Sequence, residues 1–291
     1  MALDFEQVQK PGRKLRKLLK RMPAQPSLKQ IHDFRTNSRQ IEATLQAFGL
    51  DAARNGRRVL KPLSRLRKRA GKIRDMDVFT SYATNVHPDD GEQDCAVQML
   101  EYLGARRRKY AKKFHTASRQ DGSKLRQRLK RVLRQLRKRN SRIQKDGRTD
   151  FGVPASVLDL ASDLASPSRL NRANLHSFRL KVKELRNVLN LAEAPDQAFV
   201  NALGRTKDAI GEWHDWEELV AISEKILDHG AQCHLVQQLK AIAAEKYQAA
   251  LSHAALLRKR YLGAAGNGKP RGSRNTHPPQ PALAAAMKLA A

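Results

Sequence analysis

Two stretches of the chain share one pattern, in which a histidine and, three positions later, an arginine each directly follow an apolar residue of a helix. Around residues 175–189 the apolar residues recur every three or four positions, as on one face of a helix. They are Leu175, Phe178, Val182, Leu185 and Leu189. One position later come His176, Arg179, Lys183 and Arg186. The pattern predicts cationic groups on the shoulder of a buried face, where weaker hydration lets them bind an anion more strongly.

The earlier stretch repeats this arrangement and is part of a larger duplication. Its apolar residues are Ile31, Phe34, Ile41, Leu45 and Phe48, and its polar residues are His32, Arg35 and Arg39. Two further segments recur in the same order: GRKLRKLLKRM as GSKLRQRLKRV, and GKIRDMDVF as GEWHDWEEL. We interpret the series as an internal repeat. The basic segment recurs at a shorter interval than the other two, which predicts an insertion around residues 144–170, a loop carrying a short helix.

The periodicities predict an all-α protein with two duplicated, roughly four-helix-bundle halves, since no stretch alternates as a strand would. The predicted parts are a lead over residues 1–10, a first half over 11–120, a second half over 121–262 and a disordered tail over 263–291. We expect the first basic helix to begin at Pro11 and Asp121-Gly122 to end the first half. Gly71 should mark a bend or a close contact, and the last helices should span roughly 214–229 and 231–262.

The net charge of the chain restricts the classes of ligand that it can be expected to bind. The chain has 57 Lys and Arg against 28 Asp and Glu, for a net charge of +29, and such an excess attracts polyanions. Residues 106–148 are densely basic, with only Asp121 and Asp146 as acids, so a salt-bridged surface is a poor explanation. Arginine forks bind phosphate oxygens in pairs. The candidate ligands of the two basic segments are Arg13, Arg16, Lys17, Lys20, Arg126, Lys130, Arg134 and Arg137. Candidates on the other helices are Arg65, Lys68, Lys72, Arg74, Lys207 and His214.

The kind of anion can be argued from what the basic helices lack. Proteins that bind single-stranded nucleic acid stack bases on aromatic side chains, but residues 106–148 offer only Tyr110 and Phe114. No motif is suited to reading base edges. A bare polyphosphate backbone therefore fits better than a nucleic acid, although composition alone leaves the two nearly even. His32 and His176 would add donors that strengthen binding toward acid pH; the alternative is a pair of hydrogen-bonded, partly buried helical histidines.

Four acidic residues follow Gly71 and Gly211, the glycines that begin the repeated segments GKIRDMDVF and GEWHDWEEL. They are Asp75, Asp77, Asp215 and Glu217. We expect them to orient arginines by ion pairing or to cap a helix; the alternative is a divalent-metal site in a phosphohydrolase. Because no nucleophile motif, phosphate-binding glycine loop or HExxH occurs, we expect no catalytic residue, no metal and no cofactor. Two distant cysteines indicate a reducing cytoplasm, and the absence of a long apolar run predicts no membrane span.

In these residues the chain resembles the CHAD family, the conserved histidine α-helical domain, over roughly residues 10–262. The resemblance is carried by both His-x-x-Arg helices and by the Gly-x-x-Arg-Asp-x-Asp-Val segment that begins at Gly71. It implies halves related by a pseudo-twofold axis, a basic central cavity and binding of inorganic polyphosphate, often at polyphosphate granules in bacteria. Gln40 and Glu42 stand where the family's first motif usually has basic residues, and His214 and Glu217 replace Arg74 and Asp77 in the second copy. These differences predict a weaker site in the first half.

Overall fold

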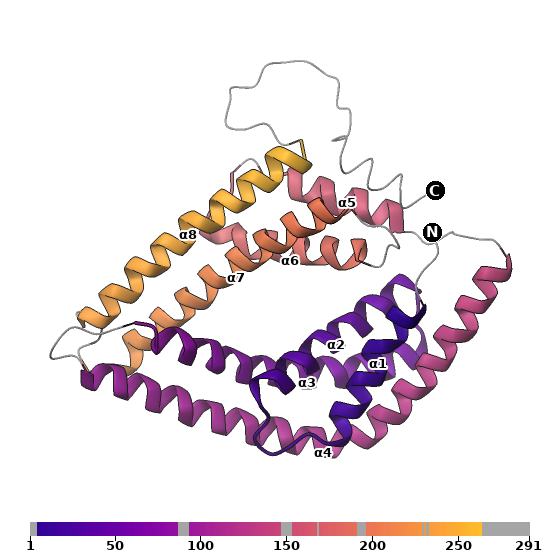
Figure 1. The fold of residues 1–291 in the computed structure, drawn as a ribbon, viewed down its shortest axis with the longest axis horizontal. Helices are drawn as coiled ribbons and strands as arrows, with labels where there is room; N and C mark the ends of the chain where they lie inside the picture. The colour runs from indigo at the N-terminus through magenta and orange to yellow at the C-terminus, as the bar shows by residue number, and fades with distance from the viewer. Residues whose placement is uncertain are drawn as a thin grey trace. The chain divides into compact units, whose positions relative to one another are not determined.

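The structure is a computed structural model that describes residues 5–86, 93–146, 153–167, 169–190, 196–228, 230 and 233–263. The helices are α1 (Phe5–Lys20), α2 (Leu28–Ala47), α3 (Arg54–Ala83), α4 (Gln93–Asp146), α5 (Val153–Ala165), α6 (Arg172–Leu189), α7 (Gln197–Ile226) and α8 (His234–Tyr261) (Figure 1). These ranges contain no strand, so the predicted all-α class is confirmed. Except for its first residue, the predicted tail lies outside the described residues.

Both helices that carry a motif histidine begin with the same local device. The Ser27 hydroxyl accepts a hydrogen bond from the Gln30 backbone N–H at 3.2 Å, and the Gln30 side chain accepts one from the Ser27 backbone at 2.8 Å. Asn171 and Asn174 form the same reciprocal pair at 3.2 and 2.8 Å. Each capping box satisfies backbone donors that have no partner within the helix. The cap stands at the same distance before the motif histidine in α2 and in α6.

Glycine and proline interrupt fewer helices than the sequence predicted. The helix start expected at Pro11 is wrong, since α1 begins at Phe5 and contains that buried proline. No helix ends at Asp121-Gly122 either, because α4 continues to Asp146. Helix α7 likewise begins at Gln197 and runs through Gly211, and α3 runs through Gly71. A glycine costs a helix only about 1 kcal/mol, which tertiary packing easily outweighs. The short helix expected in the insertion is confirmed as α5.

The chain divides into two compact units. Unit 1 comprises residues 1–3, 149–214 and 242–291, and unit 2 comprises residues 4–148 and 215–241. Helix α7 therefore passes from unit 1 to unit 2 after His214, and α8 passes back after Ala241. The predicted symmetry axis and central cavity stay predictions.

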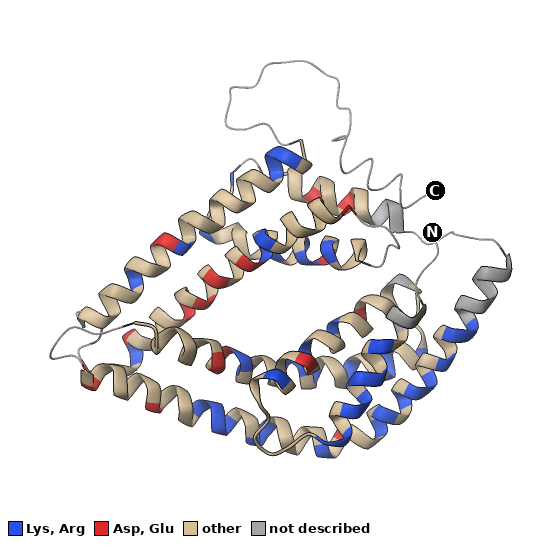
Figure 2. Cartoon of the chain, viewed as in Figure 1, with Lys and Arg blue, Asp and Glu red and all other residues tan. Residues whose placement is uncertain are grey.

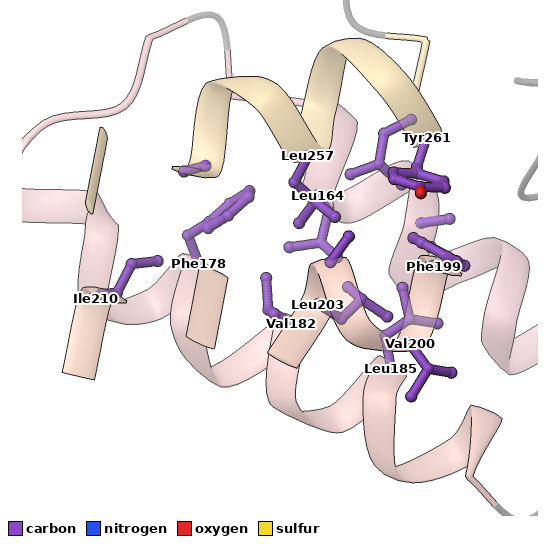
Figure 3. Close-up of a cluster of buried hydrophobic side chains, with 14 of the residues drawn as sticks. Leu164, Phe178, Val182, Leu185, Phe199, Val200, Leu203, Ile210, Leu257 and Tyr261 are labelled. Atoms are coloured by element: carbon purple, nitrogen blue, oxygen red, sulfur yellow. The ribbon is translucent and has the colours of Figure 1, made fainter. Parts of the chain in front are cut away.

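Each unit has an apolar core that includes one of the predicted stripes. In unit 1 all five predicted residues of α6 are buried, and they pack against Phe199 and Leu203 of α7 and Leu257 of α8 (Figure 3). In unit 2 the stripe of α2 is buried as well, and Phe34 meets Phe114 of α4 edge to face at 5.2 Å. Full burial of such a side chain contributes about 1.5–3 kcal/mol. The stripes thus fix which side of α2 and α6 faces inward, and so where the basic positions lie.

Candidate anion-binding residues

In unit 2 the motif arginine of α2 lies directly on a glycine of α3. A Cβ atom at Gly71 would stand 2.6 Å from Nη1 of Arg35, so a larger residue there would displace the guanidinium. Burial lowers the pKa of Arg35, nearby Asp75 opposes that change, and Arg74 and Arg67 add to it. Arg35 is therefore a half-buried cation in a crowded basic environment, the kind of group that gains most from an added anion.

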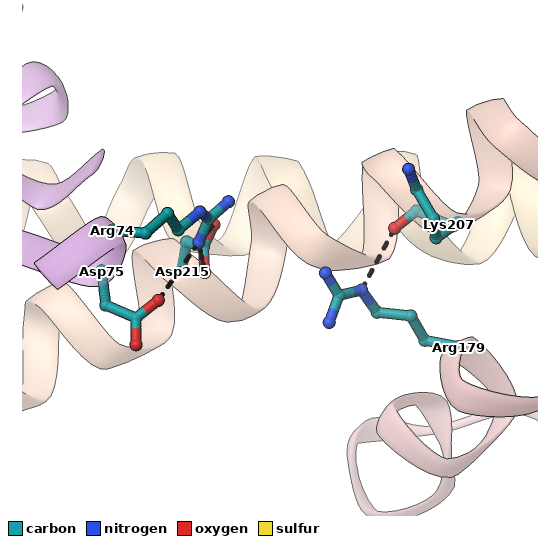
Figure 4. Close-up of polar contacts among 5 residues, drawn as sticks. All are labelled: Arg74, Asp75, Arg179, Lys207 and Asp215. Atoms are coloured by element: carbon teal, nitrogen blue, oxygen red, sulfur yellow. Dashed lines mark hydrogen bonds and ion pairs between the residues drawn. The ribbon is translucent and has the colours of Figure 1, made fainter. Parts of the chain in front are cut away.

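Unit 1 repeats this arrangement between α6 and α7. A Cβ atom at Gly211 would stand 2.7 Å from Nη2 of Arg179, whose Nε donates to the backbone oxygen of Lys207 at 3.2 Å (Figure 4). Two turns along, a Cβ atom at Gly204 would stand 3.3 Å from Nε of Arg186. The two contacts run in opposite directions along the two helices, so α6 and α7 are antiparallel, with two arginines on two glycines.

The second arginine–glycine contact has a different counterpart in unit 2. Position 42 of α2 corresponds to Arg186 in the repeat, and there Glu42 accepts both arms of the Arg67 guanidinium, one of them at 3.0 Å from Nη2 to Oε1. Where α6 presents a cation, α2 therefore carries an acid that already neutralises a neighbouring arginine.

Three of the predicted orienting acids contact arginines within unit 2. Arg74 lies 2.8 Å from Oδ2 of Asp215 and 3.5 Å from Oδ1 of Asp75 (Figure 4). Arg107 lies 2.5 Å from Oδ1 of Asp77. Burial acts to lower the pKa of Arg74, but Asp215 and Asp75 together outweigh this effect and raise that pKa. Burial raises the pKa of Asp75 in spite of Arg35 and Arg74. Glu217, the fourth acid, lies half-buried on α7.

Helices α1 and α4 of unit 2 form a basic antiparallel pair. A Cβ atom at Gly12 would stand 2.7 Å from the methyl carbons of Leu133, and one at Gly122 would stand 3.6 Å from the backbone oxygen of Leu19. Between these two contacts Arg16 and Arg126 are half-buried. The other six candidates of the pair are exposed: Arg13, Lys17, Lys20, Lys130, Arg134 and Arg137. Figure 2 shows basic residues along α1 and the second part of α4.

Several arginines among the candidates have an unsatisfied donor. The Nε–H groups of Arg16, Arg126 and Arg186 are buried, and none of the three has a hydrogen-bond partner. Leaving a donor buried and unpaired costs about 1–3 kcal/mol. These guanidinium groups are therefore not held by Nε hydrogen bonds in their present orientation.

The two motif histidines, His32 and His176, are exposed rather than partly buried. His32 lies on α2 with its Nε2 at 3.4 Å from the Thr36 hydroxyl. In unit 1 the rings of exposed His176 and half-buried His214 meet edge to face with centroids 5.0 Å apart.

The remaining candidates are spread along several helices. Arg65 lies 3.7 Å from Asp121, and Lys207 lies 2.6 Å from the neighbouring Asp208. Lys68 and Lys72 are exposed on α3, whereas Arg39 and Lys183 are half-buried. The structure thus brings together the Arg74–Asp75–Asp215 group in unit 2, and Arg179 with Lys207 and His176 with His214 in unit 1.

Sequence reasoning missed three of the residues that build these groups. Arg107 was not singled out within the basic run, although it pairs with Asp77. Arg67 was not distinguished from its basic neighbours, and Gly204 was not recognised as a partner of Arg186. The available signal was spacing, because the two arginines of α6 and the two glycines of α7 are both seven positions apart. Equal spacing on antiparallel helices predicts paired contacts.

These features define a strongly basic, all-helical protein in which motif arginines lie against glycines of a neighbouring helix. Residues 12–222 match the family model of the CHAD domain, and the chain belongs to this family. The CHAD domain is associated with polyphosphate-related proteins. Neither the comparison with curated proteins nor that with solved structures found a match.

Two features bear on other classes of site. Within the described residues, no group of three or more His, Cys, Asp and Glu side chains could hold a metal ion. No helix in the described ranges is long and apolar enough to span a bilayer.

Proposed function

We propose that this protein binds inorganic polyphosphate through its basic helices and catalyses no reaction on it. The observation that carries the proposal is the antiparallel pair of α1 and α4, which presents cations almost without acids. Between Arg106 and Lys138 the sequence of α4 has Asp121 as its single acid. A surface of this kind attracts a polyanion and gains free energy from the counterions that binding releases.

Arg16 and Arg126 are the proposed central ligands of this surface. Both stand between the glycine contacts of the pair, and both have a buried Nε–H without a hydrogen-bond partner. Turning either guanidinium toward a phosphate group breaks no Nε hydrogen bond. Each arginine can then offer two parallel N–H donors to phosphate oxygens, which is the geometry that suits this side chain best.

The proposal includes a second set of ligands on the α6–α7 pair and a duplicated architecture. Two observations support the duplication. Helices α2 and α6 begin with the same type of capping box, and the motif arginine of each lies against a glycine of the following helix, α3 or α7. We propose that the halves are related by a pseudo-twofold axis around a basic central cavity. Glu42 neutralises Arg67 at the position of α2 that corresponds to Arg186 in α6. The site on α2 and α3 in the first half should therefore bind polyphosphate more weakly than the site on α6 and α7.

Polyphosphate is favoured over nucleic acid because the aromatic residues of the basic run are unsuitable as platforms for bases. Phe114 is fully buried against Phe34. Tyr110 has the ammonium of Lys72 5.6 Å and the guanidinium of Arg106 5.8 Å from its ring centroid. Without stacking, a nucleic acid would gain little beyond its phosphate contacts.

The acids and histidines have supporting roles in this proposal. Asp77 and Asp215 accept from arginines, which suits orienting groups better than metal ligands. Exposed His32 and His176 would add donors as they become protonated toward acid pH. We propose cytoplasmic polyphosphate granules as the place where the protein acts, in keeping with its family.

The test is a calorimetric titration of the full chain with medium-chain polyphosphate and with single-stranded RNA at equal phosphate concentration. We expect polyphosphate binding to persist from about 50 to about 300 mM salt, while RNA binding falls away more steeply. Equal loss of both ligands with salt would reduce the site to a diffuse basic surface.

A charge-matched pair of variants locates the site. Arg16→Gln with Arg126→Gln should weaken polyphosphate binding about thirtyfold, at about 1.4 kcal/mol per tenfold and about 1 kcal/mol for each partly exposed contact. The control, Arg54→Gln with Arg57→Gln, removes the same charge from exposed positions of α3. Equal weakening in both variants would show that net charge, rather than these two arginines, sets the affinity.

A further inference from the structure

Unit 2 contains a pocket that the basic surface does not account for. It has a volume of about 320 Å³ and lies where α3, α4 and the last part of α7 meet. Four of its residues recur at helical spacing on α3 from Lys72 to Phe79, and four more do so on α7 from Glu218 to Lys225. Pockets for small organic ligands have volumes of about 300–1,000 Å³, so this one would hold a single small molecule.

The chemistry of the pocket differs from that of the basic helices. Its apolar side chains include Met76, Phe79 and Ile222. Its four charged residues balance, because Lys72 and Lys225 stand against two carboxylates. A charge-balanced, partly apolar pocket in a chain of net charge +29 is poorly suited to a bare polyanion, which has no apolar part and no donor for a carboxylate.

The lysines and Tyr110 indicate the anionic part of the ligand. The ammonium of Lys72 lies 5.6 Å from the centroid of the Tyr110 ring, and Arg106 approaches the same ring at 5.8 Å. Lys225 adds a third cation on α7. Cations beside an aromatic ring at the wall of a pocket are suited to one or two phosphate groups of a ligand whose planar part packs nearby.

The carboxylates indicate hydrogen-bond donors on the ligand. Asp75 and Glu218 line the pocket from facing helices. Burial raises the pKa of Asp75, and Glu218 and Asp215 add to that rise. The contact of Asp75 with Nη1 of Arg74 is long, at 3.5 Å, so the hydroxyl or amino groups of a ligand could supply further donors to this carboxylate.

We propose that this pocket binds a nucleotide, with the base against Ala221 and Ile222, the phosphates on Lys72 and Lys225, and sugar hydroxyl or base N–H donors on Asp75 and Glu218. Nucleotides combine an anionic group, a planar apolar surface and several donors in one molecule of suitable size. This binding is independent of polyphosphate binding on α1 and α4, although Lys72 of α3 is also among the candidate polyphosphate ligands.

The test is calorimetric titration of the full chain with ADP at physiological salt, beside adenosine and inorganic pyrophosphate. We expect ADP to bind at least about tenfold more tightly than either fragment, because only ADP engages the lysines together with the apolar and acidic side chains. Pyrophosphate that binds as tightly as ADP, or displaces it at equal concentration, would overturn the proposal, since ADP would then be held as a simple anion.

A pocket-filling variant and a matched control localise the binding. Ala221 is exposed on α7 and lines the pocket, so Ala221→Trp should abolish ADP binding. Ala244→Trp places the same side chain on an exposed position of α8 and should leave ADP binding unchanged. Circular dichroism checks that both variants fold. ADP binding that survives Ala221→Trp would refute the proposal that the pocket is the nucleotide site. Polyphosphate binding is measured in a separate titration and should be the same in both variants.

Discussion

Replacing Gly211 by alanine tests whether the arginine–glycine contact is a device for binding phosphate. The new Cβ atom would stand 2.7 Å from Nη2 and 3.1 Å from Nε of Arg179, whereas ordinary contact begins near 3.4 Å. The guanidinium must therefore move by about 0.7 Å, which is enough to break its 3.2 Å hydrogen bond to the Lys207 backbone oxygen.

The two effects on stability nearly cancel. Alanine favours the helix by about 1 kcal/mol over glycine. The lost hydrogen bond from a charged donor costs about 1.5–3 kcal/mol, at the lower end here because Arg179 is partly exposed. Urea denaturation should therefore show a change within about 1 kcal/mol. Polyphosphate affinity should nevertheless fall about fivefold, because the displaced arginine no longer meets its phosphate group.

Gly104→Ala is the control for this experiment. Its Cβ atom would be in ordinary contact, 3.7 Å from Nη1 of Arg108, so only the gain in helix propensity remains. We expect this variant to be slightly more stable than the parent and to bind polyphosphate equally well. If Gly211→Ala also kept full affinity, the contact between Arg179 and Gly211 would be a packing feature without a role in binding.

Two further predictions concern the ion pairs of unit 2. Arg74→Met leaves the buried carboxylate of Asp215 without its partner and should destabilise the protein by about 2 kcal/mol in urea denaturation, whereas Arg65→Met, which removes an exposed pair, should cost less than about 0.5 kcal/mol. Asp75 has a raised pKa, so its folded form holds the proton more tightly than the unfolded chain, and stability is lost as pH rises from the usual aspartate pKa through the raised one. Asp75→Asn should remove that loss, and a pH series of denaturation curves that stayed parallel to the parent's would contradict this account.

The parts of the fold that follow from burial could be predicted from the sequence. The stripe of Leu175, Phe178 and Val182 can be recognised in the sequence because burial of each side chain stabilises the fold by about 1.5–3 kcal/mol. This is more than the differences in helix propensity between ordinary residues. The capping box of Ser27 and Gln30 was also present in the sequence, as Ser-x-x-Gln before a periodic helix. With its counterpart in α6, it could have strengthened the case for duplication.

The glycines show why other features could not be predicted. Gly71, Gly122 and Gly211 all stand inside continuous helices, where they admit an arginine or a neighbouring helix. In the sequence a glycine that ends a helix and one that permits close approach look alike. Pairs such as Arg107 with Asp77 depend on the register between two helices, which periodicity within one helix does not specify.

The interleaving of the two units affects how the chain is synthesised and how it can be divided. Unit 2 needs residues 215–241, and unit 1 needs residues on both sides of that segment. Neither unit can therefore be completed on the ribosome before the other has largely emerged, and α1 must wait for the far part of α4 before their glycine contacts can form. No single cut separates the two units, so the protein should tolerate neither truncation into halves nor exchange of one half as a cassette.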